Sequence, residues 1–375
     1  MRFVLVVILL ALSTPALSVA QAPTTPCAVP LSAADADLTP RPATHRIASG
    51  EGVAVAVIDT GVAAHPQLGE VEAVADLVAR ATPDPLFDCD GHGTIVAGVI
   101  RDIAPGARLL SIRQSSAHYR TDRADTSGTL ANLAEAIHLA IDARARVINV
   151  SVVSCVPAHQ APLIDARVLD DALHRAESEG VIVVAAAGNN GGNCHPGSVV
   201  YPAHSPTVVA VSATHSRDPH SSAEYSLPGE FSAPGIVAAG LSPSGEGRAS
   251  GMTTGNGDAS AFEGTSFAAP VVSGTAALLR ERYSDETAAE IRERLWQAAE
   301  PGLGVVDPHR VLTYVAGPPL LTPSRDLMLE VPAPLADPAR ERALLLFGLF
   351  AVVLVIGVLI RRLTGGQPDS PASSM

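Results

Sequence analysis

Four polar residues in this chain of 375 residues have the types and surroundings of catalytic groups. Asp59 follows the apolar run VAVAVI, and His92 lies between two glycines in the segment DGHGT. Asn189 follows the run VVAAAG, and Ser266 lies in the segment GTSFAAP, which leads into an apolar stretch. A carboxylate, an imidazole, an amide and a hydroxyl are the groups that nucleophilic catalysis uses, because a hydroxyl attacks well only after a base has taken its proton.

Each of the four residues has a plainer explanation when it is taken alone. An aspartate after a strand can bind magnesium or a ribose, and a histidine in a loop often has no catalytic role. Asn189, which precedes Asn190 and Gly191, is typical of a turn. Ser266 can simply cap a helix, with Pro270 tolerated near the first turn. The case for a site depends on whether the fold brings the four together.

The elements that would position these residues alternate along the chain. From residue 51 onward, Val- and Ile-rich runs alternate with helical stretches, which predicts an α/β fold with a mostly parallel sheet and helices on both faces. Catalytic groups of such sheets gather beyond the carboxyl ends of the strands, where Asp59 and Asn189 are expected. The predicted strands are 53–58, 108–112, 147–152, 181–186 and 208–212, and the predicted helices are 127–143, 162–179, 266–283 and 285–299.

Together, the segments VAVIDTGV, DGHGT, AAAGNNG and GTSFAAP resemble the aspartate, histidine, oxyanion and serine motifs of the subtilisin-like serine proteases. Their order along the chain is also that of the subtilisins, and it differs from the orders in chymotrypsin and the α/β-hydrolases. The resemblance covers residues 50–315 and implies a subtilisin-like fold with a catalytic triad of Asp59, His92 and Ser266. It further implies that the Asn189 amide and the Ser266 backbone N–H stabilise the oxyanion, and that no cofactor takes part.

The segment INVSVV, at residues 148–153, resembles the family strand that pairs with an extended peptide substrate. Strand addition of this kind supplies main-chain hydrogen bonds, and it assigns substrate binding to Ser151, Val152 and Val153. Many family members have glycines after the serine, whereas this chain has valines. We therefore expect a narrower primary pocket that prefers small side chains.

Four cysteines in an exported chain predict two disulfides, for which three pairings exist. Cys155 and Cys194 lie just beyond two predicted neighbouring strands and can meet, which leaves Cys27 to pair with Cys89. The second bond would join an N-terminal arm to the loop three residues before His92. Because no CxxC spacing occurs, the cysteines do not indicate a metal site.

Both ends of the chain carry apolar segments. Residues 1–20 have one arginine, an apolar run and then small residues, which is typical of a secretory signal peptide. Ala22 gives a second cleavage position, and an uncleaved signal anchor is the alternative. Residues 343–360 carry no charge and would span about 27 Å as a helix, which matches the hydrocarbon core of a membrane. They predict a transmembrane helix rather than a buried core helix, because the run has no polar face.

These segments define the predicted organisation of the chain. An N-terminal extension covers residues 21–49 and the peptidase domain covers residues 50–315. A Pro-rich linker at residues 316–342 holds the domain away from the membrane. A cleaved signal peptide would place the domain outside the cell, so residues 361–375 are expected to form a cytoplasmic tail. The sequence thus predicts a single-pass protein of the cell membrane with an extracytoplasmic peptidase domain.

The charge of the chain argues against a nucleic-acid partner. All 25 basic residues are arginines, and the 38 acidic residues outnumber them to give a net charge of −13. A polyphosphate partner requires a basic surface, which this composition does not favour.

The short arm with its disulfide, the second disulfide, the proline-rich linker and the single C-terminal helix resemble the mycosins, the subtilisin-like proteases of type VII secretion systems. An arm of residues 21–49 is too short to be a folded inhibitory prodomain, so we expect it to be retained. The resemblance implies a membrane-anchored serine endopeptidase with protein or peptide substrates and type VII membrane components as partners. One alternative is a structural subunit of the secretion machinery whose proteolysis is secondary. A second alternative is a nonspecific scavenger protease.

Overall fold

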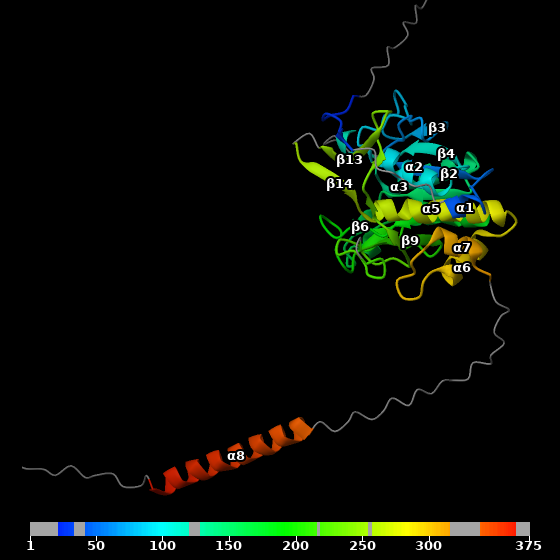
Figure 1. Cartoon of the computed structure of the whole chain (residues 1–375). Helices are drawn as coiled ribbons and strands as arrows, with labels where there is room; N and C mark the ends of the chain where they lie inside the picture. Colours follow the sequence, from blue (N-terminus) through cyan, green and yellow to red (C-terminus); the bar gives the residue numbers. More distant parts are fainter. Residues whose placement is uncertain are drawn as a thin grey trace, which may run out of the picture. The chain divides into compact units, whose positions relative to one another are not determined.

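The computed structural model describes residues 22–33, 42–119, 128–215, 218–253, 257–315 and 338–364. The chain divides into two compact units, Met1–Ala316 and Gly317–Met375 (Figure 1). The predicted signal peptide lies outside the described residues, as do residues 316–337 of the predicted linker and 365–375 of the predicted tail.

A seven-stranded sheet forms the centre of the first unit, with the strand order β10-β9-β7-β5-β2-β4-β3. All six strand pairs in it are parallel. Its strands are β2 (Ala54–Asp59), β3 (Val71–Asp76), β4 (Arg108–Arg113), β5 (Val147–Val150), β7 (Ile182–Ala186), β9 (Val208–Thr214) and β10 (Phe231–Pro234). The five predicted strands are all present, with ends shifted by one or two residues. The edge strands β3 and β10 are additional, and they lack the continuous Val and Ile runs that made the inner strands predictable.

Helices cover both faces of this sheet (Figure 1). Helices α2 (His92–Ile103) and α5 (Thr265–Arg282) pack on one face, and α3 (Leu130–Asp142) and α4 (Arg167–Ser178) pack on the other. The residues of β2 alternate between the two faces, since Val55 and Val57 join the α2/α5 core whereas Ala56 and Ile58 join the α3/α4 core. This period of two, with both faces apolar, accounts for the continuous hydrophobic run in the sequence.

Three predicted helices are shorter than expected at their N-termini. Helix α3 begins at Leu130, after its N-cap residue Thr129. Helix α4 begins at Arg167 because Pro162 lies in a separate 3₁₀ turn, Ala161–Leu163. Helix α6 (Ala288–Ala298) begins after Thr287, whose side chain forms a capping box with Glu290. A further helix, α7 (Pro308–Thr313), ends the described part of the first unit.

The N-terminal arm contains regular structure where the sequence predicts only an extended segment. Its strand β1 (Val29–Ser32) pairs antiparallel with β13 (Arg248–Thr253), and a short helix α1 (Pro42–His45) follows. Strands β11 (Ile236–Val237), β12 (Gly240–Leu241) and β14 (Ala259–Glu263) complete this smaller antiparallel sheet. The arm is also joined to the body by the Cys27–Cys89 disulfide.

A separate two-stranded sheet follows the predicted substrate segment. Strand β6 (Ser154–Val156) pairs antiparallel with β8 (Val199–Tyr201). The second disulfide, Cys155–Cys194, joins β6 to the loop before β8. Both disulfides therefore follow the pairing that the positions of the strands indicated.

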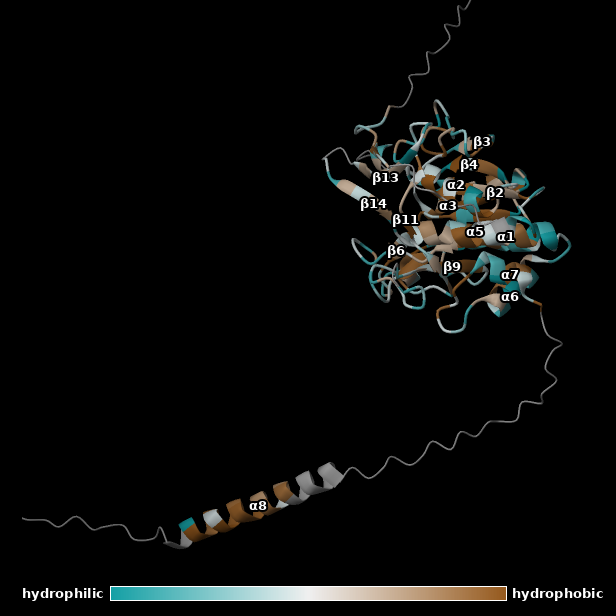
Figure 2. Cartoon of the chain, viewed as in Figure 1, coloured by the Kyte–Doolittle hydropathy of each residue, from teal (hydrophilic) through white to brown (hydrophobic). Residues whose placement is uncertain are grey.

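Helix α8 (Pro338–Thr364) covers residues 343–360, for which the sequence predicts a membrane span. Figure 2 shows that most of its coloured length is hydrophobic. Within the residues that the structure describes, however, no helix combines the length and apolar composition needed to cross a membrane.

Candidate active site

Asp59 is the last residue of β2, and its side chain is fully buried. One carboxylate oxygen, Oδ1, accepts a hydrogen bond from the Thr60 backbone N–H at 2.8 Å. The neighbouring strands β4 and β5 lie on opposite sides of β2, so the strand is close to the point at which the sheet reverses its direction of winding. Open α/β sheets place their reactive groups at this point, just beyond the strand ends.

His92 is the first residue of α2, and its ring reaches back to Asp59. The distance from His92 Nδ1 to Asp59 Oδ1 is 2.7 Å, and 27% of the His92 side chain is exposed. The flanking glycines are required sterically, because Gly91 has a φ of 75° and a Cβ on Gly93 would lie 2.0 Å from the Gly61 carbonyl oxygen. The glycines of the GHG segment thus let the imidazole approach the carboxylate.

The acidic surroundings of His92 raise its pKa. Desolvation of the ring is the largest single influence and favours the neutral form, but it is outweighed. The charge of Asp59, its hydrogen bond to the ring, and the charges of Asp88 and Asp90 together raise the pKa of His92 above its ordinary value of 6.5. The imidazolium that forms when His92 takes a proton is therefore stabilised.

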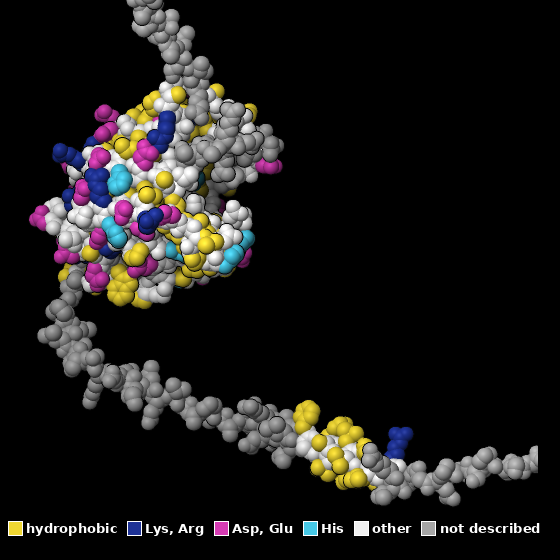
Figure 3. Space-filling view, turned by 180° about the vertical axis from the view of Figure 1, so that it is seen from behind, with side chains coloured by type: hydrophobic (Ala, Val, Ile, Leu, Met, Phe, Trp, Pro, Cys, Tyr) yellow, Lys and Arg dark blue, Asp and Glu magenta, His cyan; other side chains and the backbone are white. Residues whose placement is uncertain are grey.

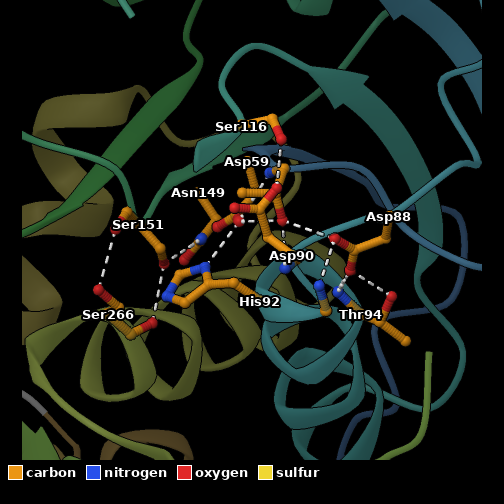
Figure 4. Close-up of polar contacts among 12 residues, drawn as sticks. Asp59, Asp88, Asp90, His92, Thr94, Ser116, Asn149, Ser151 and Ser266 are labelled. Carbon is orange, nitrogen blue, oxygen red and sulfur yellow. Dashed lines mark hydrogen bonds and ion pairs between the residues drawn. The ribbon is translucent and has the colours of Figure 1, made fainter. Parts of the chain in front are cut away.

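Ser266 is the second residue of α5, and Figure 4 shows it on the side of the His92 ring opposite Asp59. The ring of the next residue, Phe267, packs against His92 with the ring centroids 5.2 Å apart. The Ser266 hydroxyl donates a hydrogen bond to the Ser151 carbonyl oxygen at 3.0 Å, and no hydrogen bond to His92 joins it in the part of the chain that is described. The structure thus brings the three side chains to one place, with the hydroxyl turned to Ser151.

Asn189 lies in the loop after β7 and is exposed. Its side chain is held by Thr265, a residue that the sequence analysis did not identify. Asn189 Oδ1 accepts from the Thr265 backbone N–H at 2.9 Å and from the Thr265 hydroxyl at 3.1 Å. Two donors at the oxygen identify that atom as the acceptor, so the amide Nδ2 faces Gly264, where it would lie 2.8 Å from an added Cβ. The signal for Thr265 was its place directly before Ser266 in the GTS segment.

Asp88 is a second group that the sequence reasoning missed. Its two oxygens accept hydrogen bonds from the Thr60 hydroxyl, the Gly91 backbone N–H, and both the backbone N–H and the hydroxyl of Thr94. It thereby joins the end of β2 to the first turn of α2, on which His92 lies. Burial is the main cause that raises the pKa of Asp88 to about 6. The available signal in the sequence was the position of its two threonine partners, Thr60 directly after Asp59 and Thr94 two residues after His92.

The predicted substrate residues follow β5, which ends at Val150 rather than at residue 152 as predicted. Ser151 is buried, and Val152 and Val153 are partly buried against the core. Residues 151–153 belong to no strand of the described chain, which leaves their backbone groups free of sheet pairing. Among the described residues, no group of three or more His, Cys, Asp or Glu side chains could hold a metal ion.

Comparison with known proteins gives consistent results. The Subtilase family model matches residues 50–323. Mycosin-4 of Mycobacterium tuberculosis strain H37Rv is 36% identical over 338 residues, which cover 80% of this chain and 72% of Mycosin-4. The structure of MycP3 protease from the type VII (ESX-3) secretion system aligns with a TM-score of 0.70 and 32% identity over 78% of this chain and 94% of that chain. A chain of the intact ESX-5 inner membrane complex aligns with a TM-score of 0.69 and 28% identity over 91% of this chain and 94% of that chain.

Proposed function

From the membership of this chain in the subtilase family of serine proteases, and from its similarity to the mycosins, we infer a specific function. We propose that the chain is a membrane-anchored extracytoplasmic endopeptidase associated with type VII protein secretion. The observation that carries the catalytic part is the 2.7 Å contact between Asp59 and His92, beside Ser266. A buried carboxylate, an imidazole and a helix-borne hydroxyl at one sheet edge are the parts of an acyl-transfer site.

In the proposed mechanism, Ser266 is the nucleophile and His92 is the general base. The Ser266 hydroxyl leaves the Ser151 carbonyl, gives its proton to His92 Nε2 and attacks the carbonyl carbon of the substrate. Asp59 Oδ1 accepts a hydrogen bond from the Nδ1–H group of His92, which keeps Nε2 free and stabilises the imidazolium. His92 then protonates the leaving amine. In the second half of the reaction, water takes the place of the amine, gives its proton to His92 and attacks the acyl-enzyme, and Ser266 is released.

The oxyanion of the tetrahedral intermediate requires fixed donors. We assign this role to Asn189 Nδ2 and to the backbone N–H of Ser266, which lies in the first turn of α5, where helix N–H groups have no partner within the helix. In support of this assignment, Thr265 holds the Asn189 amide by its oxygen, and the nitrogen lies beside Gly264, two residues before Ser266. Extended substrate would pair with residues 151–153, where Val152 and Val153 favour small side chains at the cleavage position.

The test of the catalytic proposal is the Ser266→Ala substitution in the full-length chain. The variant should lose reaction with a fluorophosphonate probe and lose peptide cleavage, because both require the hydroxyl. A variant that still labels and still cleaves would refute the assignment of Ser266. A peptide library cleaved mainly after large aromatic residues would refute the narrow pocket.

The proposed membrane anchor is α8. In the proposed organisation of the chain, a signal peptide at 1–20, an extension at 21–49, a peptidase domain at 50–315 and a linker at 316–342 precede the anchor, and a tail at 361–375 follows it. The described side chains of α8 include large exposed hydrophobic groups on every side, from Leu346 to Ile360. Figure 3 shows hydrophobic side chains along this helix, and Arg361 follows Ile360 directly in the sequence. An exposed apolar helix of this kind is stable in lipid and unfavourable in water.

A second candidate function is a structural role in a secretion complex. The similarity to a chain of the ESX-5 inner membrane complex favours it, because that chain is part of a large assembly. Measuring secretion in cells that carry Ser266→Ala separates the two functions. Loss of cleavage with normal secretion would assign the secretion role to the folded body, whereas loss of both would assign it to catalysis. Mass spectrometry of the secreted proteins in the same cells would identify the substrate.

A further inference from the structure

The first turn of α5 contains a carbonyl group that lacks its usual helical donor. In an α-helix, the carbonyl of each residue accepts a hydrogen bond from the backbone N–H four residues later. For Ser266 that residue is Pro270, which lies inside the helix and has no N–H. The Ser151 hydroxyl takes its place and donates to the Ser266 carbonyl oxygen at 2.8 Å. A side chain from outside the helix therefore replaces the missing helical bond at the proposed nucleophile.

The Ser151 hydroxyl is itself held by two buried side chains. Asn149 Nδ2 donates to Ser151 Oγ at 2.9 Å, and Asn149 Oδ1 accepts from the Ser273 hydroxyl at 2.8 Å. Asn149 and Ser273 are fully buried, and Ser151 is 3% exposed. Because Ser273 and Ser266 both belong to α5, the chain of hydrogen bonds starts on this helix, passes through β5 and the residue after it, and returns to the same helix.

The direction of every bond in this chain follows from its last member. A carbonyl oxygen only accepts, so the single proton of Ser151 must point to Ser266. Ser151 Oγ must then accept from Asn149, which places Nδ2 toward Ser151 and Oδ1 toward Ser273. The three residues have one self-consistent arrangement, in which each side-chain nitrogen and oxygen atom has a hydrogen-bond partner.

A second bond joins the same two residues in the opposite direction. The Ser266 hydroxyl donates to the Ser151 carbonyl oxygen at 3.0 Å, and Figure 4 shows both contacts as dashed lines. Both the backbone and the side chain of Ser266 are thus hydrogen-bonded to Ser151, the first residue of the proposed substrate segment.

We propose that Ser151, Asn149 and Ser273 are positioning residues that set the location of the Ser266 backbone, and with it the reactivity of the Ser266 hydroxyl. The inference rests on the proposed function of Ser266 as nucleophile. Nucleophilic attack is sensitive to displacements of a fraction of an ångström, and a helix turn that lacks a bond is free to shift. The hydroxyl of Ser151 removes this freedom and ties the nucleophile to the segment that receives the substrate.

The experiment compares Ser151→Ala with the unmodified full-length chain in detergent. The substitution removes the hydroxyl and keeps the backbone carbonyl. We expect kcat and the rate of fluorophosphonate labelling to fall about ten-fold, with KM changed by less than about two-fold, because the lost bond acts on the nucleophile. A rise in KM with an unchanged labelling rate would overturn the proposal.

A second substitution tests the cause directly. In Ser151→Ala combined with Pro270→Ala, residue 270 regains an N–H that can donate to the Ser266 carbonyl. The double variant should recover most of the lost labelling rate, whereas Pro270→Ala alone should label like the unmodified chain. No recovery in the double variant would contradict the proposed role of the carbonyl bond.

The matched control is Ser212→Ala. Ser212 is also 3% exposed, and its hydroxyl donates to the Phe231 carbonyl at 3.0 Å. Both serine variants should melt at a lower temperature, but only Ser151→Ala should lose reactivity; equal reactivity in the two would overturn the inference. Ser266→Ala separates this result from the proposed function, since activity in that variant refutes the nucleophile itself, whereas an inactive Ser266→Ala with a fully active Ser151→Ala refutes only the positioning role.

Discussion

At the scale of single residues, the carboxylates around His92 determine the pH at which the site works. The base must be neutral to accept a proton, and Asp59, Asp88 and Asp90 raise the pKa of His92 above 6.5. We expect kcat/KM to rise with pH through a midpoint above 6.5. Replacing Asp90 by Asn removes one of the charges and should move this midpoint to lower pH while the triad stays intact.

The matched control for that pH profile is Asp142→Asn, at the end of α3 on the other face of the sheet. It should leave the midpoint where it is. A profile whose acid limb does not move in Asp90→Asn would show that Asp90 does not influence the base. An NMR titration of the His92 ring in Ser266→Ala gives the pKa independently of turnover.

The buried carboxylate of Asp88 predicts a specific dependence of stability on pH. Its pKa is raised from 3.8 to about 6, so the folded state binds a proton more tightly than the unfolded state does. The stabilisation that this provides is complete below about pH 3.8 and is lost as the pH rises through about 6. The free energy of unfolding of the unmodified chain, relative to Asp88→Asn, should therefore fall by up to about 3 kcal/mol between pH 4 and pH 7.

Chemical denaturation of both proteins at several pH values measures this difference. A constant difference across the range would contradict the raised pKa. Asp88→Asn should also lower kcat at every pH, because an amide cannot accept from all four donors that hold the His92 turn.

The sequence allowed the prediction of reactive groups but not of the groups that hold them. The motifs of the family contain the reactive residues themselves, Asp59, His92, Asn189 and Ser266, and their residue types indicate the chemistry. The supporting residues are serines, threonines and an aspartate, types that are common on any surface and become informative only when they are buried. The bond from Ser151 to Ser266, for example, depends on a missing N–H at Pro270 and on two segments 115 residues apart.

At the scale of elements, the two disulfides tie different parts of the site to the body. Cys27–Cys89 closes a separation of 62 residues and holds the loop before His92, whereas Cys155–Cys194 closes 39 residues and holds the strand after the substrate segment. In the chain-entropy model, each bond contributes about 4 kcal/mol to stability. Replacing either pair by alanine should therefore lower the melting temperature by a similar amount.

The kinetic effects of the two replacements should differ, so that each serves as control for the other. Loss of Cys27–Cys89 loosens the turn that carries His92 and should lower kcat. Loss of Cys155–Cys194 loosens the two-stranded β6–β8 sheet next to residues 151–153 and should raise KM. Identical changes in kcat and KM for both variants would show that the disulfides act on overall stability alone.

The elements themselves were predictable where they are buried on all sides and apolar along their length. Strands such as β2, which are apolar on both faces, and helices such as α5 were clear from the residue pattern. The antiparallel sheet of β1, β11, β12, β13 and β14 was not, because its strands are short, partly exposed and paired across distant parts of the chain. The N-terminal arm was predicted as an extension, and only the pairing of β1 with β13 gives it a place in the fold.

At the scale of the whole molecule, the first unit contains complete cores on both faces of its sheet, built only from residues before 316. Its folding should therefore not depend on the second unit. A chain that ends at residue 316 should keep the kcat and KM of the full-length protein toward a short peptide, because no residue proposed for the site lies beyond Ser273. If truncation abolished peptide cleavage, the second unit would have a role in the site that the core does not indicate.

The same truncation tests the proposed anchor, because the apolar side chains of α8 are removed with it. We expect the full-length chain in the membrane fraction and the truncated chain in the soluble fraction, since transfer of exposed Leu, Val and Ile side chains into lipid is the term that favours the membrane. Full-length Ser266→Ala is the control and should stay in the membrane fraction. Truncated protein that remains with membranes would instead assign attachment to the first unit, and the structural role in a secretion complex would then be favoured over an anchor formed by α8.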